Sequence, residues 1–447
     1  MTFDVVIIGA GPGGFDTAIY AKKQGLNVLL IEKASLGGTC LNWGCIPTKA
    51  IYQNAKTLKT IQNSHTFGID VTDFSINLDT IKERKEQIVS DQIKNIQTTL
   101  QKLDINYIEG TAQIKDSHHV HVNNTVYETK YIIIATGSTV SKITFEGDHL
   151  DIVKTSKELL DLDTIPTHLT VIGGGVIGIE MAAIFHGLGS EVDVIEYMPS
   201  ILPSLDSDIS RRAKSLLKRS GIKFHTKATF DKVTQEDSHF LAHYTEKNKT
   251  KSLITDTILV ATGRAPNFGN LRLEEVGINH SKAGIIVNAF KQTNIANIYA
   301  IGDVNGENML AHKATYDGYQ AINHILNKTS DIRFDLVPGV VFSFPEIASV
   351  GVKEDDLEKG TYEVHKALFK ANAKAQCLGE TEGYAKLIID HDRYVIGTHI
   401  IGPHASDLIH ECTALMNQKI TIDAYANIIH AHPTISEVLA DSVKELV

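Results

Sequence analysis

The sequence has 447 residues, which is enough for about three domains of roughly 150 residues each. Asp and Glu outnumber Lys and Arg by 53 to 43, so the formal net charge is −10, which argues against nucleic acid or an anionic membrane surface as a partner. The hydrophobic fraction of 43% predicts a large buried core, and no apolar run reaches the roughly 18–20 residues that span a bilayer.

The first predicted elements surround a glycine-rich turn. Residues 4–8 are interpreted as a buried strand. The apolar run over residues 5–10 is not read as a secretion signal, because no Lys or Arg precedes it and Gly and Pro interrupt it at once. The turn follows over residues 9–14, then a helix over about 15–24. A second strand over 27–31 ends at Glu32.

The same pattern returns later in the chain with equal spacing from the first glycine to the acid. A strand over 169–172 runs into a glycine turn over 173–178, a helix to about Leu188, and a strand over 191–195 that ends at Glu196. In such a unit the glycines permit a tight turn and a close approach of a pyrophosphate, and the acid accepts hydrogen bonds from ribose hydroxyls.

Two copies predict two dinucleotides, a bound flavin and a nicotinamide nucleotide. Glu196 suits a free ribose 2′-hydroxyl and would repel a 2′-phosphate, and the residues directly after it supply no arginine. We therefore expect NAD rather than NADP.

Three further apolar strands end in a glycine turn, over 131–137, 257–263 and 298–303. The third places Asp303 just after a glycine, where its carboxylate could reach a cofactor hydroxyl. A polar segment over 327–339 ends in Pro-Gly and suggests a domain boundary.

The last part of the chain is predicted to be an α+β domain. We expect strands over 340–344, 385–389 and 395–401, followed by a helix over about 405–417. With the two glycine-turn units, the fold class is α/β, with two Rossmann-like dinucleotide-binding domains and this C-terminal domain.

The four cysteines are too sparse for a secreted disulfide scaffold, and none has the two-residue spacing of the common zinc pattern. Cys377 and Cys412 are interpreted as inert. Cys40 and Cys45 stand in a glycine-rich segment, and in a reducing compartment a paired disulfide is more often catalytic than structural. The alternative interpretation of Cys40 and Cys45 is two buried cysteines that form no disulfide. From the cysteine usage and the missing secretion signal we expect a cytoplasmic protein.

Two groups of histidines invite a chemical interpretation. His432 precedes a proline, which favours a loop before the last helix, and Glu437 on that helix could orient its ring. From spacing alone a structural role remains open, and His430 is a weaker candidate for a base. Residues 118–121 contain three histidines. In a strand, His119 and His121 would share one face, but no third ligand lies nearby, so we expect a strand or hairpin and no metal site.

Five segments together resemble the flavin-dependent pyridine nucleotide–disulphide oxidoreductases along essentially the whole chain. They are the redox segment 37–49, the segments 309–314 and 429–437, and the C-terminal patterns 344–346 and 397–403. Within the class I branch, which carries its disulfide in the FAD domain, the chain is most similar to the dihydrolipoamide dehydrogenases.

Two positions depart from the family pattern. Trp43 sits between the cysteines, where a smaller or basic residue is commoner, and Asp317 stands where the family usually has Glu. Neither departure removes a catalytic group, and Trp43 bears only on access to Cys40.

The resemblance implies roles for the redox residues. Cys45 would face the flavin, and Cys40 would exchange with substrate. Lys49 would lie near the flavin and pair with Glu180. The pair of His432 and Glu437 would supply a base to the active site of the other subunit, so that a homodimer carries two composite sites.

The resemblance also implies a division into four segments and sets of cofactor-binding residues. The segments are the first part of the FAD-binding domain with the redox disulfide (1–142), the NAD-binding domain (143–265), the return to the central FAD-binding domain (266–335) and the dimerisation domain (336–447). The expected FAD-binding residues are Gly9, Gly11, Pro12, Gly14, Glu32, Lys33, Gly38, Thr39, Lys49, Ala112, Thr136, Gly137, Asp303, Met309, Leu310, Ala311 and His312. The expected NAD-binding residues are Gly173, Gly175, Val176, Ile177, Gly178, Glu196 and Gly263.

The expected activity is oxidation of dihydrolipoamide with reduction of NAD, in a 2-oxo-acid dehydrogenase complex with a lipoylated E2 or in glycine cleavage with an H-type protein. Three alternatives stay open at this point: another NAD(P)H-dependent disulfide or metal reductase of the same family, a flavoprotein kept as a docking subunit, and a thiol-independent NADH oxidase.

Overall fold

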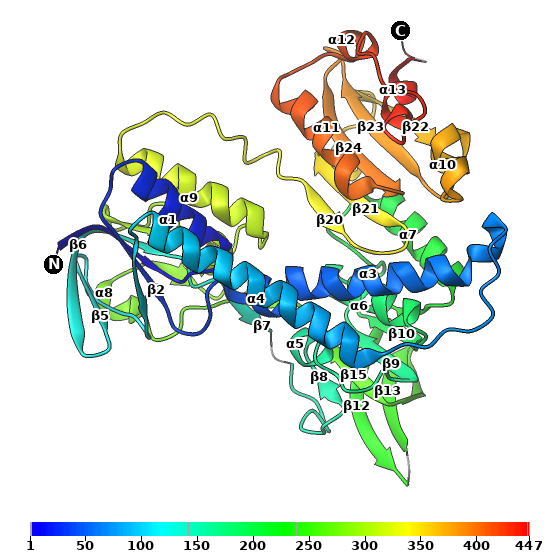
Figure 1. Ribbon diagram of the computed structural model, residues 1–447, viewed down its shortest axis with the longest axis horizontal. Coiled ribbons are helices and arrows are strands. Elements are labelled where there is room, and N and C mark those ends of the chain that lie inside the picture. The colour runs from blue at the N-terminus through cyan, green and yellow to red at the C-terminus, as the bar shows by residue number, and fades with distance from the viewer. Residues whose placement is uncertain (1, 142, 238, 445, 447) are drawn as a thin grey trace. The chain divides into compact units, whose positions relative to one another are not determined.

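The computed structural model of the chain describes residues 2–141, 143–237, 239–444 and 446. The described chain forms two compact units, and each unit is built from three stretches of sequence (Figure 1). Unit 1 comprises Met1–Ile51, Ser75–Lys142 and Gly263–Ile332, and unit 2 comprises Tyr52–Phe74, Ile143–Thr262 and Arg333–Val447.

Unit 1 is organised around a seven-stranded sheet in the order β3-β2-β1-β6-β5-β4, with β19 paired to β6. The pairs made by β1 with β2 and β6, by β2 with β3 and by β19 with β6 are parallel. Buried apolar side chains fill β19, most of β1 and β2 and the end of β6, as expected of strands covered on both faces. The strands are β1 (Thr2–Ile8), β2 (Val28–Glu32), β3 (Asn106–Glu109), β4 (Gln113–Asp116), β5 (His119–Val122), β6 (Thr125–Ile134) and β19 (Ile298–Ala300).

Helices cover this sheet, and α1 (Pro12–Lys23) lies beside α9 (Ala311–Ile325) (Figure 1). The two helices approach so closely that a Cβ on Gly13 would lie 3.0 Å from the Cβ of Ala314. The other helices of unit 1 are α2 (Gly38–Trp43), the long α4 (Leu78–Lys102), α8 (Leu273–Val276) and the 3₁₀ helix η2 (Gly302–Asn305). Two small ladders complete it: β7 (Ser138–Val140) with β16 (Arg264–Pro266), and β17 (His280–Ser281) with β18 (Gly284–Ile285).

Helix α3 (Cys45–Gln62) begins in unit 1 and continues into unit 2, where the 3₁₀ helix η1 (Ser64–Phe67) follows it. Unit 2 contains a second parallel sheet in the order β11-β10-β9-β15-β8. Its helix α6 is buried along most of its length, which an almost wholly apolar sequence permits. The elements are β8 (Val153–Lys154), α5 (Ser156–Leu159), β9 (His168–Ile172), α6 (Val176–Gly187), β10 (Glu191–Glu196), α7 (Ser207–Ser220), β11 (Lys223–Thr226) and β15 (Thr257–Val260).

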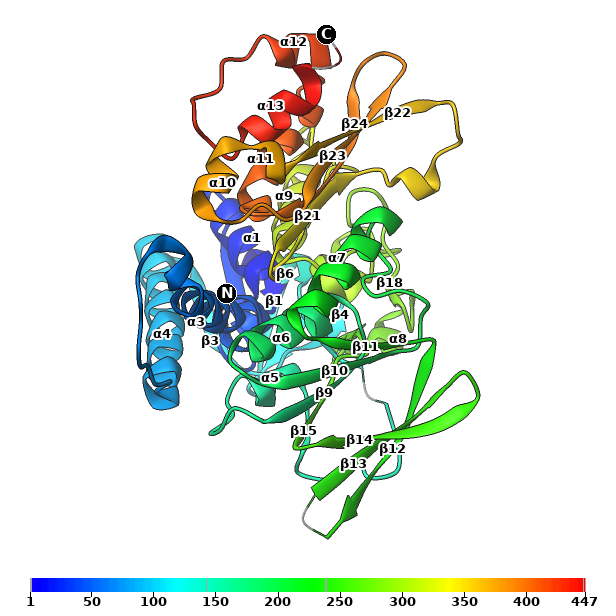
Figure 2. The same cartoon turned by 90° about the vertical axis from the view of Figure 1, so that its right-hand side faces the viewer.

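An antiparallel meander follows β11 and consists of β12 (Ala228–Glu236), β13 (His239–Glu246) and β14 (Lys249–Thr255). The C-terminal part of unit 2 is an antiparallel sheet in the order β20-β21-β24-β23-β22, with α11 and α13 on one side of it (Figure 2). Its elements are β20 (Gly339–Val341), β21 (Glu346–Gly351), η3 (Glu354–Asp356), β22 (Tyr362–Leu368), η4 (Phe369–Ala371), α10 (Ala373–Leu378), β23 (Tyr384–Asp390), β24 (Val395–Gly402), α11 (Ala405–Asn417), α12 (Ile422–Ala426) and α13 (Glu437–Lys444).

The predicted fold class is confirmed: two Rossmann-like parallel sheets and a C-terminal α+β region are present. The predicted helix over 405–417 is α11, but the strand predicted over 340–344 ends at Val341. Two predicted strands also end before their glycine turns, at Ile134 and Val260. The histidine-rich residues 119–121 lie on β5 between two antiparallel partners, as a strand should. Within the described ranges, no helix has the length and apolar character needed to cross a membrane.

Candidate active site

The redox segment places its two cysteines on different helices. Cys40 lies on α2, and Cys45 is the first residue of α3. The two form a disulfide with a Cα–Cα distance of 4.7 Å. A Cβ on Gly44, between the helices, would lie only 3.0 Å from the carbonyl oxygen of Thr39. The two cysteines are therefore joined across a break in the helix at Gly44, where the chain folds back closely on Thr39.

The same segment is packed against the first glycine turn. Gly38 has a positive φ of 56°, and a Cβ there would lie 2.8 Å from the Cα of Gly11. Asn42 holds the segment's shape, because its amide nitrogen donates to the carbonyl oxygens of Leu36 (3.0 Å) and Gly38 (2.9 Å). The disulfide and the predicted pyrophosphate turn thus belong to one local structure in unit 1.

The first glycine turn has the features that a pyrophosphate site needs. Helix α1 begins at Pro12, and its N-cap Gly11 offers no side chain to cap the first backbone N–H groups. These N–H groups and the helix dipole favour an anion at that end. A Cβ on Gly14 would collide with the carbonyl of Gly9, so only glycine allows the helix to pack this closely on β1.

The second glycine turn repeats this arrangement in unit 2. Helix α6 starts at Val176 after the N-cap Gly175, again without a side-chain cap. A Cβ on Gly178 would collide with the carbonyl of Gly173, whereas a Cβ on Gly175 would have no neighbour within 4 Å. Gly175 therefore leaves space above the turn, and Gly178 is needed for helix packing.

Both strand-end acids are held in the same way. Glu32 accepts hydrogen bonds from the backbone N–H groups of Ala10 (2.8 Å) and Ala34 (2.9 Å). Glu196 accepts from the N–H groups of Gly174 and, at 2.6 Å, Met198. The two carboxylates are buried and fixed at the mouth of their turns, and each retains lone pairs for a ribose hydroxyl.

Asp303 lies on η2 at the edge of the unit 1 sheet, where a chain of hydrogen bonds holds its side chain. The hydroxyl of Ser138 donates to Asp303, and Arg264 donates both to that hydroxyl and to the carbonyl of Ser138, each at 2.7 Å. Burial lowers the pKa of Arg264, and the Asp303 charge opposes that shift. Sequence reasoning missed Ser138 and Arg264, although both directly follow the glycines of predicted strand turns.

The expected FAD-binding residues all belong to unit 1, and the expected NAD-binding residues belong to unit 2 except Gly263, which opens the last stretch of unit 1. Thr136 donates to the carbonyl of Asn267 at 2.6 Å, and Leu310 is the N-cap of α9. Ala112 is buried in the hydrophobic core, whereas Lys33 is exposed.

Lys49 lies on α3, one turn after Cys45, in unit 1. Glu180 is buried on α6 in unit 2, where its carboxylate accepts a hydrogen bond of 2.9 Å from the backbone N–H of Phe342. The ion pair between Lys49 and Glu180 stays a prediction.

The predicted base, His432, lies just before α13 and is largely exposed, with 72% of its side chain accessible. Its Nδ1 is 3.0 Å from Oε1 of Glu437, whose other oxygen accepts from the N–H of Thr434 at 2.8 Å. The hydrogen bond from Thr434, followed by that from His432, lowers the pKa of Glu437. By contrast, Nε2 of His430 is buried against Glu411 at 2.8 Å, so its ring is engaged within its own domain.

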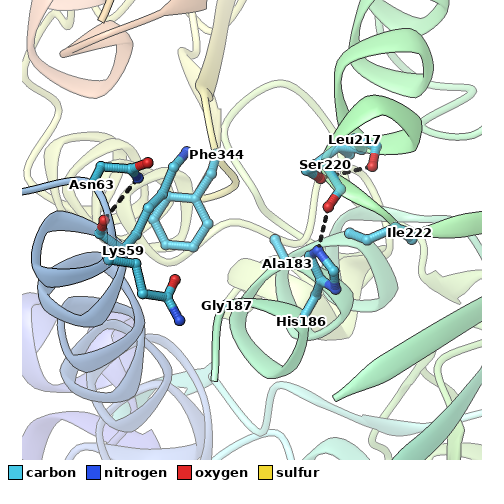
Figure 3. Close-up of a pocket in the computed structure, with 10 residues that line it drawn as sticks. Lys59, Asn63, Ala183, His186, Gly187, Leu217, Ser220, Ile222 and Phe344 are labelled. Carbon is cyan, nitrogen blue, oxygen red and sulfur yellow. Dashed lines mark hydrogen bonds between the residues drawn. The ribbon is translucent and has the colours of Figure 1, made fainter. Parts of the chain in front are cut away.

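A separate pocket of about 190 Å³ lies in unit 2 (Figure 3). Phe344 and Lys59 face each other on one side, with the amine 5.2 Å from the ring centroid, and His186 lies opposite with its Nε2 2.7 Å from the carbonyl of Ser220. None of the predicted site residues lines this pocket.

The two free cysteines differ in their surroundings. Cys377 is exposed, whereas Cys412 is buried on α11. Burial raises the pKa of the Cys412 thiol to about 12, so it carries no thiolate at neutral pH.

Comparison with known proteins gives a consistent result. The family model described as pyridine nucleotide-disulphide oxidoreductase matches residues 3–318, and the model of the dimerisation domain of these oxidoreductases matches residues 337–443. Dihydrolipoyl dehydrogenase of Bacillus subtilis (strain 168) is 36% identical over 449 residues, covering 98% of this chain and 97% of the relative. Leghemoglobin reductase of Glycine max is 37% identical over 456 residues, covering 98% of this chain and 86% of the relative.

Among solved structures, the chain is similar to the HOCl-induced flavoprotein disulfide reductase RclA from Escherichia coli. The TM-score is 0.88 at 28% sequence identity, and the alignment covers 99% of both chains.

Proposed function

The chain belongs to the pyridine nucleotide-disulphide oxidoreductase family, and from that premise we propose that it oxidises dihydrolipoamide to lipoamide while NAD is reduced. The observation that carries the proposal is the disulfide of Cys40 and Cys45, packed against a glycine turn built for a dinucleotide. Relatives with the name dihydrolipoyl dehydrogenase match 98% of the chain. They favour this activity over another disulfide or metal reductase, or an NADH oxidase.

FAD and NAD are the cofactors, and the residues present fit them. Two uncapped helix N-termini face two glycine turns, and each turn carries an anchored acid. When bound, FAD accepts two electrons from a dithiol, and NAD takes them up as a hydride. Gly11, Glu32 and Asp303 would hold FAD, and Gly175 and Glu196 would hold NAD, with no 2′-phosphate beside the second acid.

The disulfide supplies the exchange chemistry. A substrate thiolate attacks the Cys40 sulfur, a new bond forms between the two sulfurs, and Cys45 leaves as a thiolate. The second substrate thiolate then attacks the substrate sulfur that is bonded to Cys40, the bond to Cys40 breaks, and Cys40 leaves as a thiolate. Lipoamide is released, and Cys40 and Cys45 remain as a reduced pair. Lys49, one helical turn from Cys45, supplies a positive field for the negative charge that forms there.

A base is needed because the thiolate, and not the thiol, is the nucleophile. We assign this role to His432, whose Nδ1 is held by Glu437 and whose other ring nitrogen is left to take the substrate proton. The base would act in the active site of the partner subunit, in a homodimer formed through the domain that matches the family's dimerisation domain.

The larger assembly is also part of the proposal. Substrate would arrive on a lipoylated E2 or on a glycine cleavage H-type protein, and the enzyme would work in the cytoplasm. The chain would be divided into FAD-binding (1–142), NAD-binding (143–265), central (266–335) and dimerisation (336–447) segments.

The test is NADH formation from dihydrolipoamide and NAD without oxygen, with NADP and glutathione run in parallel. We expect NADH only with dihydrolipoamide and NAD. Cys45→Ser should abolish turnover, whereas Cys377→Ser, which changes an exposed free cysteine, should retain it. Undiminished turnover in Cys45→Ser would refute the disulfide relay. NADH consumption by oxygen that survives both Cys40→Ser and Cys45→Ser would instead identify an NADH oxidase.

A further inference from the structure

Four charged side chains gather beside the Gly302–Asn305 turn, and we call them the lysine–carboxylate cluster: Lys291, Glu307, Lys313 and Asp317. The Nζ of Lys313 is 2.8 Å from Asp317 Oδ2 and 2.6 Å from Glu307 Oε2. The Nζ of Lys291 is 2.6 Å from Glu307 Oε2 and 3.4 Å from Asp317 Oδ1. All four residues belong to unit 1.

The cluster is balanced in charge and mostly removed from solvent. The side chain of Asp317 is 0% exposed, and those of Lys291 and Lys313 are 5% and 4% exposed. Burial raises the pKa of Glu307, but the hydrogen bonds from the two lysines outweigh it, so the pKa is lowered overall. Two cations and two anions therefore offset one another, and removing one charge would leave a buried ion without its counter-charge.

Asp317 connects this cluster to the turn that carries Asp303. Its Oδ2 accepts a hydrogen bond of 3.0 Å from the backbone N–H of Gly302 and one of 3.3 Å from the side-chain amide of Asn305. The carbonyl of Lys291 also accepts the N–H of Ala300 at 3.0 Å, which fixes the end of β19 just before the turn.

The turn is thus held from two sides. The lysine–carboxylate cluster fixes its backbone, and Ser138 with Arg264 fixes the Asp303 side chain. We propose that Asp317 is a positioning residue for flavin binding, which sets the direction of Asp303 through the N–H of Gly302. This inference rests on the proposed function only in that FAD is the resident cofactor.

The test compares Asp317→Asn with Asp317→Glu and with a control, Asp206→Asn. Asn keeps the shape of Asp and removes its charge, whereas Glu keeps the charge. Asp206 is an equally buried aspartate whose two oxygens each lie 2.9 Å from Lys386 Nζ, but it belongs to unit 2, which contains no expected FAD-binding residue. Each full-length holoenzyme is diluted and FAD release is followed by the recovery of flavin fluorescence, while unfolding by urea is followed by circular dichroism.

We expect Asp317→Asn to raise the FAD dissociation constant about 10-fold, since the N–H of Gly302 loses its charged acceptor and Lys313 loses its counter-charge. Asp317→Glu should recover most of the affinity, and Asp206→Asn should lower the urea midpoint without loosening FAD. If Asp317→Asn lowered the urea midpoint as Asp206→Asn does but left FAD affinity unchanged, Asp317 would be structural only and the proposal would be wrong.

Should Asp317→Asn not fold, Glu307→Gln provides the second variant, because Glu307 is 41% exposed and contacts both lysines. It should weaken FAD binding in the same direction, and unchanged affinity would contradict the proposal. A wild-type protein purified with no flavin and unable to take it up would instead refute the proposed function.

Discussion

At the scale of single residues, Glu437 joins the candidate base to its own helix. One carboxylate oxygen faces Nδ1 of His432, and the other accepts the N–H of Thr434. Because the pKa of Glu437 is lowered by these contacts, the carboxylate is ionised at neutral pH. A negative charge in this position orients the imidazole and stabilises it once it has accepted a proton.

Glu437→Gln is therefore expected to lower kcat/KM for dihydrolipoamide by about 10- to 100-fold, since the amide keeps the shape but not the charge. The measurement is steady-state NADH formation across pH 6–9. Asp441→Asn is the matched control, because Asp441 lies on the same helix and pairs only with Lys444 at 3.0 Å among its described contacts. Equal activity of both variants would contradict the role of Glu437.

Residue-level prediction from sequence succeeded where the chemistry is local. The glycines and Glu32 and Glu196 are readable because turn geometry and strand-end position depend on a few neighbouring residues. The support of Asp303 was not readable, because its partner Ser138 is 165 positions away in the chain. Asp317 was noted only as a departure from the family pattern, and its contact with the N–H of Gly302 emerges from folding alone.

At the scale of elements, two glycines of the β9–α6 turn are needed for different reasons, one for ligand space and the other for helix packing. Gly175→Ala should fold normally, because a Cβ there meets nothing within 4 Å, but it would occupy the space left for a pyrophosphate. Gly178→Ala should destabilise the turn itself, because its Cβ collides with the carbonyl of Gly173.

We expect the KM for NAD to rise at least about 10-fold in Gly175→Ala while the urea midpoint stays at the wild-type value. In Gly178→Ala we expect a higher KM for NAD together with a lower urea midpoint. NAD kinetics and urea unfolding measured on the same preparations distinguish the two. A wild-type KM in Gly175→Ala would show that no phosphate lies above this turn.

Asp208, at the start of α7, is expected to stabilise the fold in a pH-dependent way. Its pKa is lowered from the ordinary 3.8 to about 2, chiefly by the hydrogen bond from Lys366, and its side chain is 23% exposed. A carboxyl whose folded pKa is depressed adds stability above its unfolded pKa and loses it as the pH falls from about 4 to about 2. Asp208→Asn should then cost about 2 kcal/mol at pH 7 and almost nothing near pH 2.

Urea midpoints at several pH values measure this difference. Asp356→Asn is the control, since Asp356 is exposed and pairs with Lys353 at 3.4 Å, and it should change stability by less than about 0.5 kcal/mol. A constant difference between Asp208→Asn and wild type from pH 7 to pH 2 would show that the Asp208 charge does not stabilise the fold.

Prediction of elements failed where tertiary contacts override the local pattern. The strand expected to reach residue 344 stops at Val341, because the N–H of Phe342 donates to the Glu180 carboxylate instead of to a strand partner. Helix α4 was not predicted at all; only three of its 25 residues are buried, so its apolar periodicity is weak. The break between α2 and α3 could likewise not be predicted from the sequence, since it depends on the close approach of Gly44 to Thr39.

At the scale of the whole molecule, the redox disulfide and the candidate base belong to different units of the chain. The Cys40–Cys45 disulfide and all expected FAD-binding residues belong to unit 1, whose last stretch of sequence follows the second parallel sheet along the chain. His432 and Glu437 belong to unit 2, in the region that matches the dimerisation domain. In the proposed homodimer, each active site would take its disulfide from one subunit and its base from the other.

Complementation tests this requirement directly. Cys45→Ser and His432→Gln should each be nearly inactive as homodimers. When the two chains are co-expressed at equal levels, about half of the dimers are mixed, and each mixed dimer contains one site with an intact disulfide and an intact base. NADH formation should then recover to about one quarter of the wild-type rate. If disulfide and base came from the same subunit, mixed dimers would contain no intact site, and the rate would stay at the level of the two variants.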